Sequence, residues 1–192
     1  MVENERGKLI LVTGGARSGK STYAEKYALE SGKRVFYIAT ATADDEEMKE
    51  RVRIHQANRP PHFSTVEESY YPHLVIEKEQ EKGTLFLLDC FTLLLSNHLL
   101  IEVGGSMEGE MDRASLEKSA QETLQYMSTL SQIMRDSPSE ILVVTNEVGM
   151  GVVPEHFLGR LYRDMAGKAN QVVADAADEA WFLVCGMAQR LK

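Results

Sequence analysis

The sequence predicts a three-layer α/β domain, and the form of its apolar segments is the first observation behind that prediction. Nearly continuous, β-branched apolar runs recur at residues 9–13, 34–40, 84–90, 140–146 and 179–185. Strands that are buried on both faces of a parallel sheet have this pattern, whereas half-exposed strands alternate between apolar and polar residues. Helix-like segments separate most of these runs, which predicts right-handed βαβ crossovers and a mostly parallel sheet with helices on both faces.

The segments between the runs predict four helices. Residues 20–31 are followed by Gly32, which suits the end of a helix. Residues 44–57 open with four acidic side chains, which favour a helix N-terminus. Residues 112–135 and 155–177 are two longer candidates.

Length and composition indicate one globular domain. We expect it to span residues 9–192, after a flexible lead-in at residues 1–8, with a mobile excursion at the glycine-rich residues 104–111. The net charge of −8 argues against nucleic acid as the main partner. No run approaches the roughly 20 apolar residues that a membrane span needs. Cys90 and Cys185 lie in or beside apolar runs, so we expect buried free thiols in a reducing, cytoplasmic compartment.

The stretch GGARSGKS fits the phosphate-loop motif G-x-x-x-x-G-K-[ST] in full and lies between a predicted strand and a predicted helix. Its glycines let the backbone N–H groups wrap around phosphates at the helix N-terminus. In such a loop Lys20 contacts the β- and γ-phosphates and Ser21 is a ligand of Mg²⁺. Arg17 is either a further phosphate contact or a solvated side chain. The predicted phosphate-binding residues are Gly14, Gly15, Ala16, Arg17, Ser18, Gly19, Lys20 and Ser21.

Polar residues also end two of the other strands. Asp89 closes an apolar strand, as the acidic residue of a Walker B segment does, and such a residue can hold Mg²⁺. The alternative is that Asp89 caps the following helix. Asn146 and Glu147 end the run at 140–146 in the same way. Because ligands of open α/β sheets bind at the carboxyl ends of the strands, we expect these residues, Thr40 and the phosphate loop to converge on one crevice.

A histidine among arginines follows the second strand. Met48, Val52 and His55 have the spacing of one helix face. A neutral imidazole is a competent nucleophile toward an α-phosphate, and nearby arginines stabilise the developing charge. The alternative is a partly buried histidine that completes an apolar stripe. The flanking arginines are Arg51, Arg53 and Arg59. The remaining histidines, His62, His73, His98 and His156, show no metal-ligand spacing.

Five segments together carry a family resemblance. GGARSGKS, YIATA, RVRIHQANRP, DCFTLLLSN and the long block from Thr145 to Gly186 resemble the bifunctional adenosylcobinamide kinase/adenosylcobinamide-phosphate guanylyltransferase family of cobalamin biosynthesis. The resemblance covers nearly the whole chain from Leu9. The phosphate loop is shared with many nucleotide-binding proteins, whereas the long block is specific to this family. The resemblance implies a RecA-like P-loop NTPase fold and a homotrimer.

The resemblance also implies two reactions. ATP or GTP phosphorylates the aminopropanol hydroxyl of adenosylcobinamide. GTP then guanylylates a protein histidine with release of pyrophosphate, and the GMP passes to adenosylcobinamide phosphate to give adenosylcobinamide-GDP. The family's histidine lies in a segment resembling R-[IV]-x-x-H-x-x-x-R-P, which places the nucleophile at His55. Some relatives carry two adjacent histidines here, but Ile54 precedes His55 in this chain.

The nucleotide contacts that the resemblance implies extend beyond the phosphate loop. They include acidic positions near the guanine nucleotide, so Asp89 is either a Mg²⁺ ligand or a hydrogen-bond acceptor for the base or ribose. Glu147 and Asp89 are the two candidates for the general base of the kinase reaction. We expect residues 44–61 to shift when GTP binds. The matching positions are Ala39, Thr40, Ala41, Gln56, Ala57, Asn58, Arg59, Glu67 and Asp89.

Two other functions are compatible with a phosphate loop. A simple P-loop kinase of a small metabolite, with His55 structural, would move the γ-phosphate and take no label from the α-phosphate of GTP. A nucleotide-dependent switch would bind nucleotide tightly, turn it over slowly and ignore a corrinoid. The net negative charge of the chain argues against a nucleic-acid-dependent motor, because such proteins usually carry basic stripes.

Overall fold

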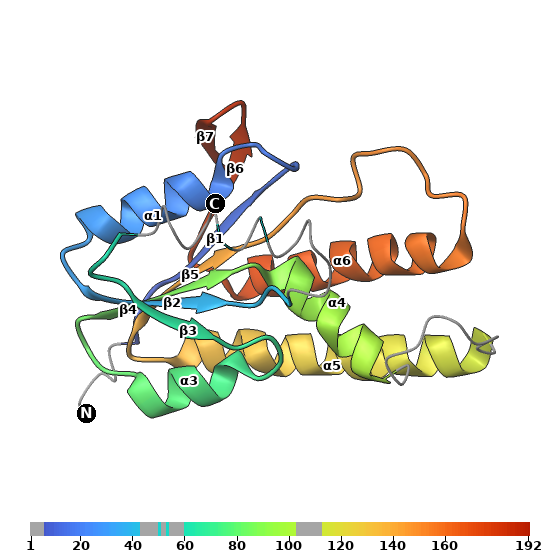
Figure 1. The fold of residues 1–192 in the computed structure, drawn as a ribbon, viewed down its shortest axis with the longest axis horizontal. Coiled ribbons are helices and arrows are strands. Elements are labelled where there is room, and N and C mark those ends of the chain that lie inside the picture. Colours follow the sequence, from blue (N-terminus) through green and yellow to red (C-terminus); the bar gives the residue numbers. More distant parts are fainter. Residues whose placement is uncertain (1–5, 43–49, 51–52, 54–59, 103–112) are drawn as a thin grey trace.

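The computed structural model describes residues 6–42, 50, 53, 60–102 and 113–192 (Figure 1). Seven strands form one sheet in the order β3-β2-β4-β5-β1-β6-β7. All neighbouring pairs are parallel except β6 and β7, which form an antiparallel hairpin at one edge. The strands are β1 Leu9–Gly14, β2 Arg34–Ala39, β3 Ser64–Glu67, β4 Thr84–Asp89, β5 Glu140–Val144, β6 Glu179–Val184 and β7 Met187–Arg190.

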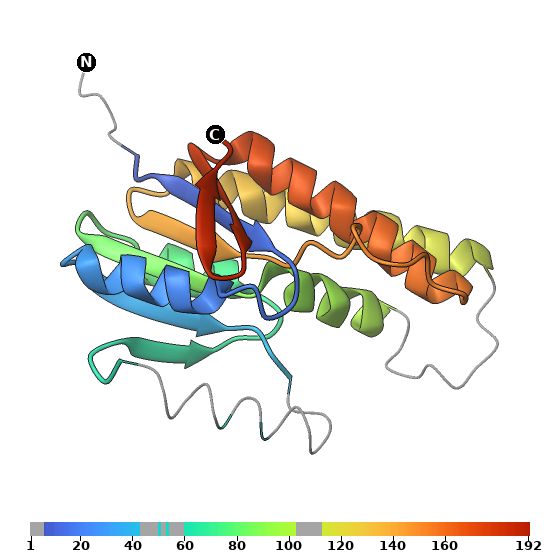
Figure 2. The same ribbon diagram turned by 90° about the horizontal axis from the view of Figure 1, so that it is seen from above.

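The helices cover both faces of the sheet unequally. Among the described residues, α1 packs on one face, and α3, α4, α5 and α6 pack on the other (Figures 1 and 2). Together with the strand order, this confirms the predicted three-layer α/β fold, a mostly parallel sheet with helices on both faces. The helices are α1 Lys20–Glu30, α3 Pro72–Glu79, α4 Phe91–Glu102, α5 Arg113–Asp136 and α6 Phe157–Ala176.

The core explains why the strand sequences are continuously apolar. In β1, Leu9 and Leu11 pack under the larger helix layer, while Ile10 and Val12 pack on the α1 side. Strand β4 divides its leucines and Phe86 between the two faces in the same way, and every one of them is fully buried. Nearly every residue of the central strands is therefore buried, and the polar residues lie at or next to the strand ends, so the sequence does not alternate between apolar and polar residues.

The five strands predicted from the apolar runs are all present, but two short strands have no such signal. Strands β3 and β7 lie at the two edges of the sheet and are mostly exposed, so their sequences are polar. Helices α5 and α6 start and end within two residues of the prediction. The helix predicted at 44–57 lies outside the described residues except at positions 50 and 53, and the excursion predicted at 104–111 lies wholly outside them.

Three helices project beyond the carboxyl edge of the sheet (Figure 1). Helix α5 has 24 residues, which corresponds to about 36 Å, whereas the strand that follows it spans only about 17 Å. Helix α6 similarly exceeds β6, and α4 begins directly after β4 and continues outward. We call α4 and the N-terminal halves of α5 and α6 the helical shelf. None of the described helices is long and apolar enough to cross a membrane.

Candidate active site

The phosphate loop connects β1 to α1, and its glycines are required by close backbone contacts. A Cβ atom on Gly14, where φ is +150°, would lie 2.4 Å from the carbonyl oxygen of Leu183. A Cβ atom on Gly19, where φ is +96°, would lie 3.1 Å from the Cα of Gly186. Larger residues would push the loop away from β6 and from the turn that follows it, so the loop conformation depends on both glycines.

Lys20 is the first residue of α1 and is buried, with 6% of its surface exposed. Its Nζ donates a hydrogen bond to the carbonyl oxygen of Gly15 at 2.6 Å and lies 3.5 Å from Ser18 Oγ. Burial lowers the pKa of Lys20, and the nearby charge of Asp89 partly opposes this. The ammonium group therefore lies over the loop backbone, where phosphate oxygens would compete with the Gly15 carbonyl for its protons.

Two neighbouring segments fix the phosphate loop in place. The N–H of Gly186, in the β6–β7 turn, donates to the carbonyl oxygen of Ser18 at 2.9 Å. On the other side, the N–H of Glu147 donates to the carbonyl oxygen of Gly14 at 3.0 Å. Hydrogen bonds from both flanks stabilise one loop conformation before a ligand arrives, which lowers the entropy cost of binding phosphate.

Asp89 ends β4, two strands from the phosphate loop and thus about 10 Å along the sheet edge. Tyr37 Oη donates to Asp89 Oδ2 at 2.7 Å and holds the carboxylate in place. Ala39 pairs with Asp89 in register, and the Thr40 N–H donates to the Asp89 carbonyl oxygen at 3.1 Å. Thr40 Oγ1 also exchanges hydrogen bonds with the backbone of Cys90, so the ends of β2 and β4 form one rigid unit.

Asn146 follows β5 and belongs to a polar network that joins the end of β5 to helices α4 and α6. Its backbone N–H and its Nδ2 donate to Thr92 Oγ1 at 3.3 and 3.0 Å. Asn170 of α6 donates to the Asn146 carbonyl oxygen at 3.0 Å and accepts from Thr145 Oγ1 at 2.7 Å. Sequence reasoning missed Thr92 and Asn170: both lie in segments that carry the family resemblance, but neither ends a strand and no motif gave either one a role.

The remaining predicted site residues are spread along the same edge. Glu67 ends β3 opposite Ala39, four strands from β1 and so about 19 Å from the phosphate loop. Ser21 and Ala41 are half-buried, and Arg17 is exposed with φ at +56°. The structure thus brings the loop, Asp89 and Asn146–Glu147 to adjacent strands and places Glu67 at the far end. The predicted residues His55, Gln56, Ala57, Asn58 and Arg59 lie outside the described residues.

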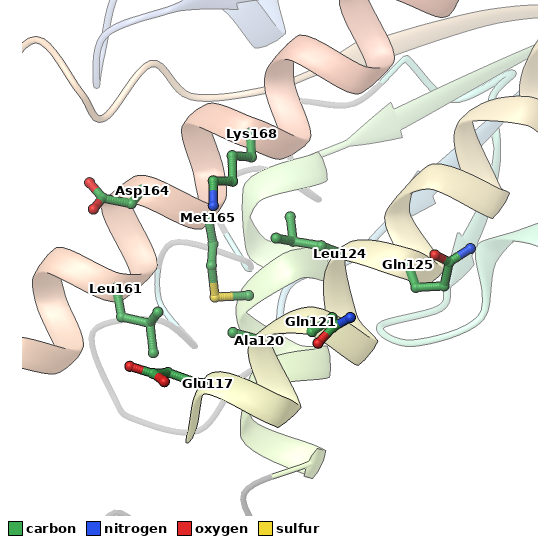
Figure 3. A pocket seen from close by; sticks show the side chains of 9 residues that line it. All are labelled: Glu117, Ala120, Gln121, Leu124, Gln125, Leu161, Asp164, Met165 and Lys168. Atoms are coloured by element: carbon green, nitrogen blue, oxygen red, sulfur yellow. The ribbon is translucent and has the colours of Figure 1, made fainter. Parts of the chain in front are cut away.

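A separate groove lies between α5 and α6 on the helical shelf (Figure 3). It has a volume of about 460 Å³, with Leu124, Leu161 and Met165 among the residues that line it and Glu117, Asp164 and Lys168 around them. None of the predicted nucleotide contacts lines this groove, so it is distinct from the phosphate-loop crevice. Within the described part of the chain, no three histidine, cysteine or acidic residues form a metal-binding group.

A glycine-rich loop between a parallel strand, β1, and the helix that follows it, α1, is the feature that defines P-loop nucleotide-binding proteins. A sequence model of the cobinamide kinase / cobinamide phosphate guanyltransferase family matches residues 10–191. The chain belongs to this family and is a bifunctional enzyme of cobalamin biosynthesis with kinase and guanyltransferase activities. The family that the sequence resemblance indicated is therefore confirmed.

Individual relatives match over almost their whole length. The bifunctional adenosylcobalamin biosynthesis protein CobU of Salmonella typhimurium is 40% identical over 185 residues, which cover 96% of this chain and 99% of that protein. The bifunctional adenosylcobalamin biosynthesis protein CobP of Pseudomonas aeruginosa is 40% identical over 182 residues, which cover 95% and 96%.

Solved structures of other proteins are more distant. The RadB recombinase has a TM-score of 0.45 at 18% identity and covers 93% of this chain and 74% of that chain. The flagellar accessory protein FlaH of Methanocaldococcus jannaschii has a TM-score of 0.42 at 15% identity, with coverage of 98% and 79%.

Proposed function

We propose that one phosphate loop serves both reactions, with the nucleotide lying across the carboxyl edge of the sheet. The observation that carries this proposal is the row of polar groups from Lys20 through Asp89 to Glu67, which extends over five adjacent strands. Phosphates held at the loop leave room for the nucleoside toward β2 and β3. The corrinoid then meets either the γ-phosphate or a transferred GMP at the same edge.

In the kinase reaction, the aminopropanol hydroxyl of adenosylcobinamide attacks the γ-phosphorus of ATP or GTP. The bond between the γ-phosphorus and the β–γ bridging oxygen breaks, and a nucleoside diphosphate leaves. Lys20 stabilises the charge on the transferring group. We assign the acceptance of the hydroxyl proton to Glu147, because its backbone is bonded to the phosphate loop and its carboxylate is only partly buried.

In the guanylyltransferase reaction, the imidazole of His55 attacks the α-phosphorus of GTP and pyrophosphate leaves. A phosphate oxygen of adenosylcobinamide phosphate then attacks the histidine-bound phosphorus. This forms the P–O–P bond of adenosylcobinamide-GDP and regenerates His55. The support for His55 is its position in the family-like segment between Arg51 and Pro60.

The residues at the phosphate loop fit a Mg²⁺ ion bound together with the nucleotide. Mg²⁺ takes one or two protein oxygens and completes its shell with phosphates and water, so Ser21 and Asp89 suffice as ligands. The hydrogen bond from Tyr37 fixes the Asp89 carboxylate at the carboxyl edge of the sheet, which supports this assignment. When bound, the ion neutralises charge on phosphate oxygens.

The family resemblance supports a homotrimer, and the two free cysteines support a location in the cytoplasm. Light scattering of the purified protein tests the first point, with three times the 21.5 kDa chain mass expected. The activities themselves are tested by giving the protein adenosylcobinamide, ATP, GTP and Mg²⁺ and following the corrinoid by mass spectrometry. We expect a phosphate adduct followed by a GDP adduct, and neither with the Lys20→Ala variant.

A further inference from the structure

The connection between β5 and α6 exposes an unusual group of apolar side chains. Met150, Val152 and Val153 are 78%, 94% and 62% exposed. We call residues 148–154 the apolar loop. Single exposed apolar residues are ordinary on protein surfaces, but a contiguous group indicates a surface that binds something apolar.

The apolar loop is fastened at both ends, so its side chains are presented by a defined backbone. At the start, Glu147 Oε1 accepts a hydrogen bond from the Gly149 N–H at 2.7 Å. At the end, Arg160 donates to the carbonyl oxygens of Pro154, at 3.0 Å, and of Glu155. Pro154 also packs on α6 so closely that a Cβ atom on Gly159 would lie 2.9 Å from it. Backbone hydrogen bonds and Pro154 therefore hold the loop, while its apolar side chains point to solvent.

The course of the apolar loop links the phosphate loop to the helical shelf. The loop starts beside Glu147, whose N–H is bonded to Gly14, and runs outward along α6 to the far end of that helix (Figure 1). The other nucleotide-contact positions, Thr40, Asp89 and Glu67, lie on the opposite side of β5, toward β3. A molecule bound to the apolar loop could therefore extend one end toward the γ-phosphate. It would not cover the ends of β2, β3 and β4, where we place the nucleoside.

We propose that Met150, Val152 and Val153 form the platform that holds the corrin ring of the acceptor, while its aminopropanol arm reaches the phosphate loop. This inference rests on the proposed kinase reaction. A corrin ring is large and rich in methyl groups, and the reacting hydroxyl sits on a flexible arm. Such an acceptor needs an exposed apolar surface beside the phosphate loop. The apolar loop is exposed and apolar, and it begins directly after Glu147, which is hydrogen-bonded to the phosphate loop and assigned as the base.

The test compares two variants that each remove an exposed apolar side chain. Val152→Ser removes it from the apolar loop. Leu29→Ser removes it from α1, where Leu29 is 42% exposed near the end of the helix that points away from the phosphate loop. The KM for adenosylcobinamide is measured at saturating ATP, and binding of adenosylcobinamide is measured by equilibrium dialysis with its visible absorbance as readout. Self-guanylylation by GTP without corrinoid reports on the nucleotide site.

For Val152→Ser we expect a KM and a dissociation constant for adenosylcobinamide that rise roughly tenfold, as lost burial of a valine side chain would produce. The kcat and the self-guanylylation stay unchanged, because the variant removes binding that is equal in ground and transition states. Leu29→Ser matches the unaltered protein throughout. Unchanged corrinoid binding by Val152→Ser overturns the proposal. A fall in molar mass by light scattering also overturns it, in favour of a contact between copies of the chain. No phosphate transfer by the unaltered protein would overturn the kinase reaction itself.

Discussion

Glu147 makes two different contacts, and they separate its structural role from the chemical role that we assign to it. Its N–H holds the phosphate loop, and its carboxylate accepts a hydrogen bond from Gly149. A glutamine at this position keeps the backbone contact and can still accept from Gly149 through its amide oxygen, but it cannot take a proton.

Glu147→Gln is therefore expected to lower the kcat of phosphate transfer to adenosylcobinamide by about 10²-fold or more, the usual effect of losing a general base. Self-guanylylation by GTP should stay within about twofold, because in the proposed reaction His55 attacks the α-phosphorus and no hydroxyl proton has to be accepted. The matched control is Glu155→Gln, an exposed carboxylate close by in the sequence. Equal losses in both reactions would show that Glu147 supports the loop and is not the base.

Asp178 shows how single residues stabilise the fold outside the site. Arg6 donates two hydrogen bonds to its carboxylate, at 2.6 and 2.7 Å, and the buried N–H of Leu9 donates a third at 2.9 Å. These contacts, with Arg6 the largest cause, lower the pKa of Asp178 to about 2. A lowered pKa in the folded state means that the stabilisation is complete above the usual carboxylate pKa and is lost as the pH falls toward 2.

Asp178→Asn is expected to lower the free energy of unfolding at pH 7 by about 1 kcal/mol, a value reduced for solvent screening because Arg6 and Asp178 are about one-third exposed. The difference from the unaltered protein should shrink between about pH 4 and pH 2. Urea unfolding at several pH values measures it, with Asp175→Asn on exposed α6 surface as control. A difference that stays constant with pH would exclude the ion pair as its source.

At the scale of elements, the β6–β7 hairpin supports the phosphate loop. Gly186 has φ at +79°, and a Cβ atom added to it would meet no other atom within 4 Å. Gly186→Ala therefore strains the backbone by about 1 kcal/mol without a clash, and it weakens the hydrogen bond to Ser18. We expect about fivefold weaker binding of both ATP and GTP, measured by calorimetry.

Gly32→Ala is the matched control for the hairpin prediction. Gly32 also has a left-handed φ, at +66°, and open space around its Cα, but it lies just past the end of α1 that is remote from the phosphate loop. It should lower stability by a similar amount and leave nucleotide affinity unchanged. Equal affinity losses in the two variants would mean that general destabilisation, and not the hairpin contact, explains the effect.

Elements that bury both faces were predictable from the sequence, and those without a periodic signal were not. The central strands are apolar because their residues, apart from those near the strand ends, are buried on both faces, whereas β3 and β7 are polar edge strands. Helix α4 escaped prediction because it is buried nearly all round, so its sequence has no amphipathic period. At the carboxyl edge of the sheet, the positions of the phosphate loop and of the polar strand ends were predictable, because motif and strand pattern fix them. Thr92, Asn170 and Gly186 were not, because only tertiary contacts bring them there.

At the scale of the whole molecule, strand order and helix length would let two kinds of ligand bind at one edge, as we propose. The order β3-β2-β4-β5-β1 sets the proposed nucleotide contacts in a row, and the helical shelf extends past the strands on one side of that row (Figure 1). A large acceptor and a nucleotide can then bind side by side with their reacting groups at the phosphate loop. This arrangement explains how a chain of 192 residues can carry two transfer reactions.

The central claim is that one nucleotide site feeds both a γ-phosphate transfer and a covalent histidine intermediate. The most direct test incubates the protein with Mg²⁺ and GTP labelled on the α-phosphate, then denatures it and counts the label on the chain. His55→Ala, Lys20→Ala and the exposed His62→Ala are treated alike. We predict that the unaltered protein and His62→Ala carry label, and that this label is lost in acid but survives base. His55→Ala and Lys20→Ala should carry none. An unlabelled protein that still phosphorylates adenosylcobinamide would contradict the account and leave a simple kinase.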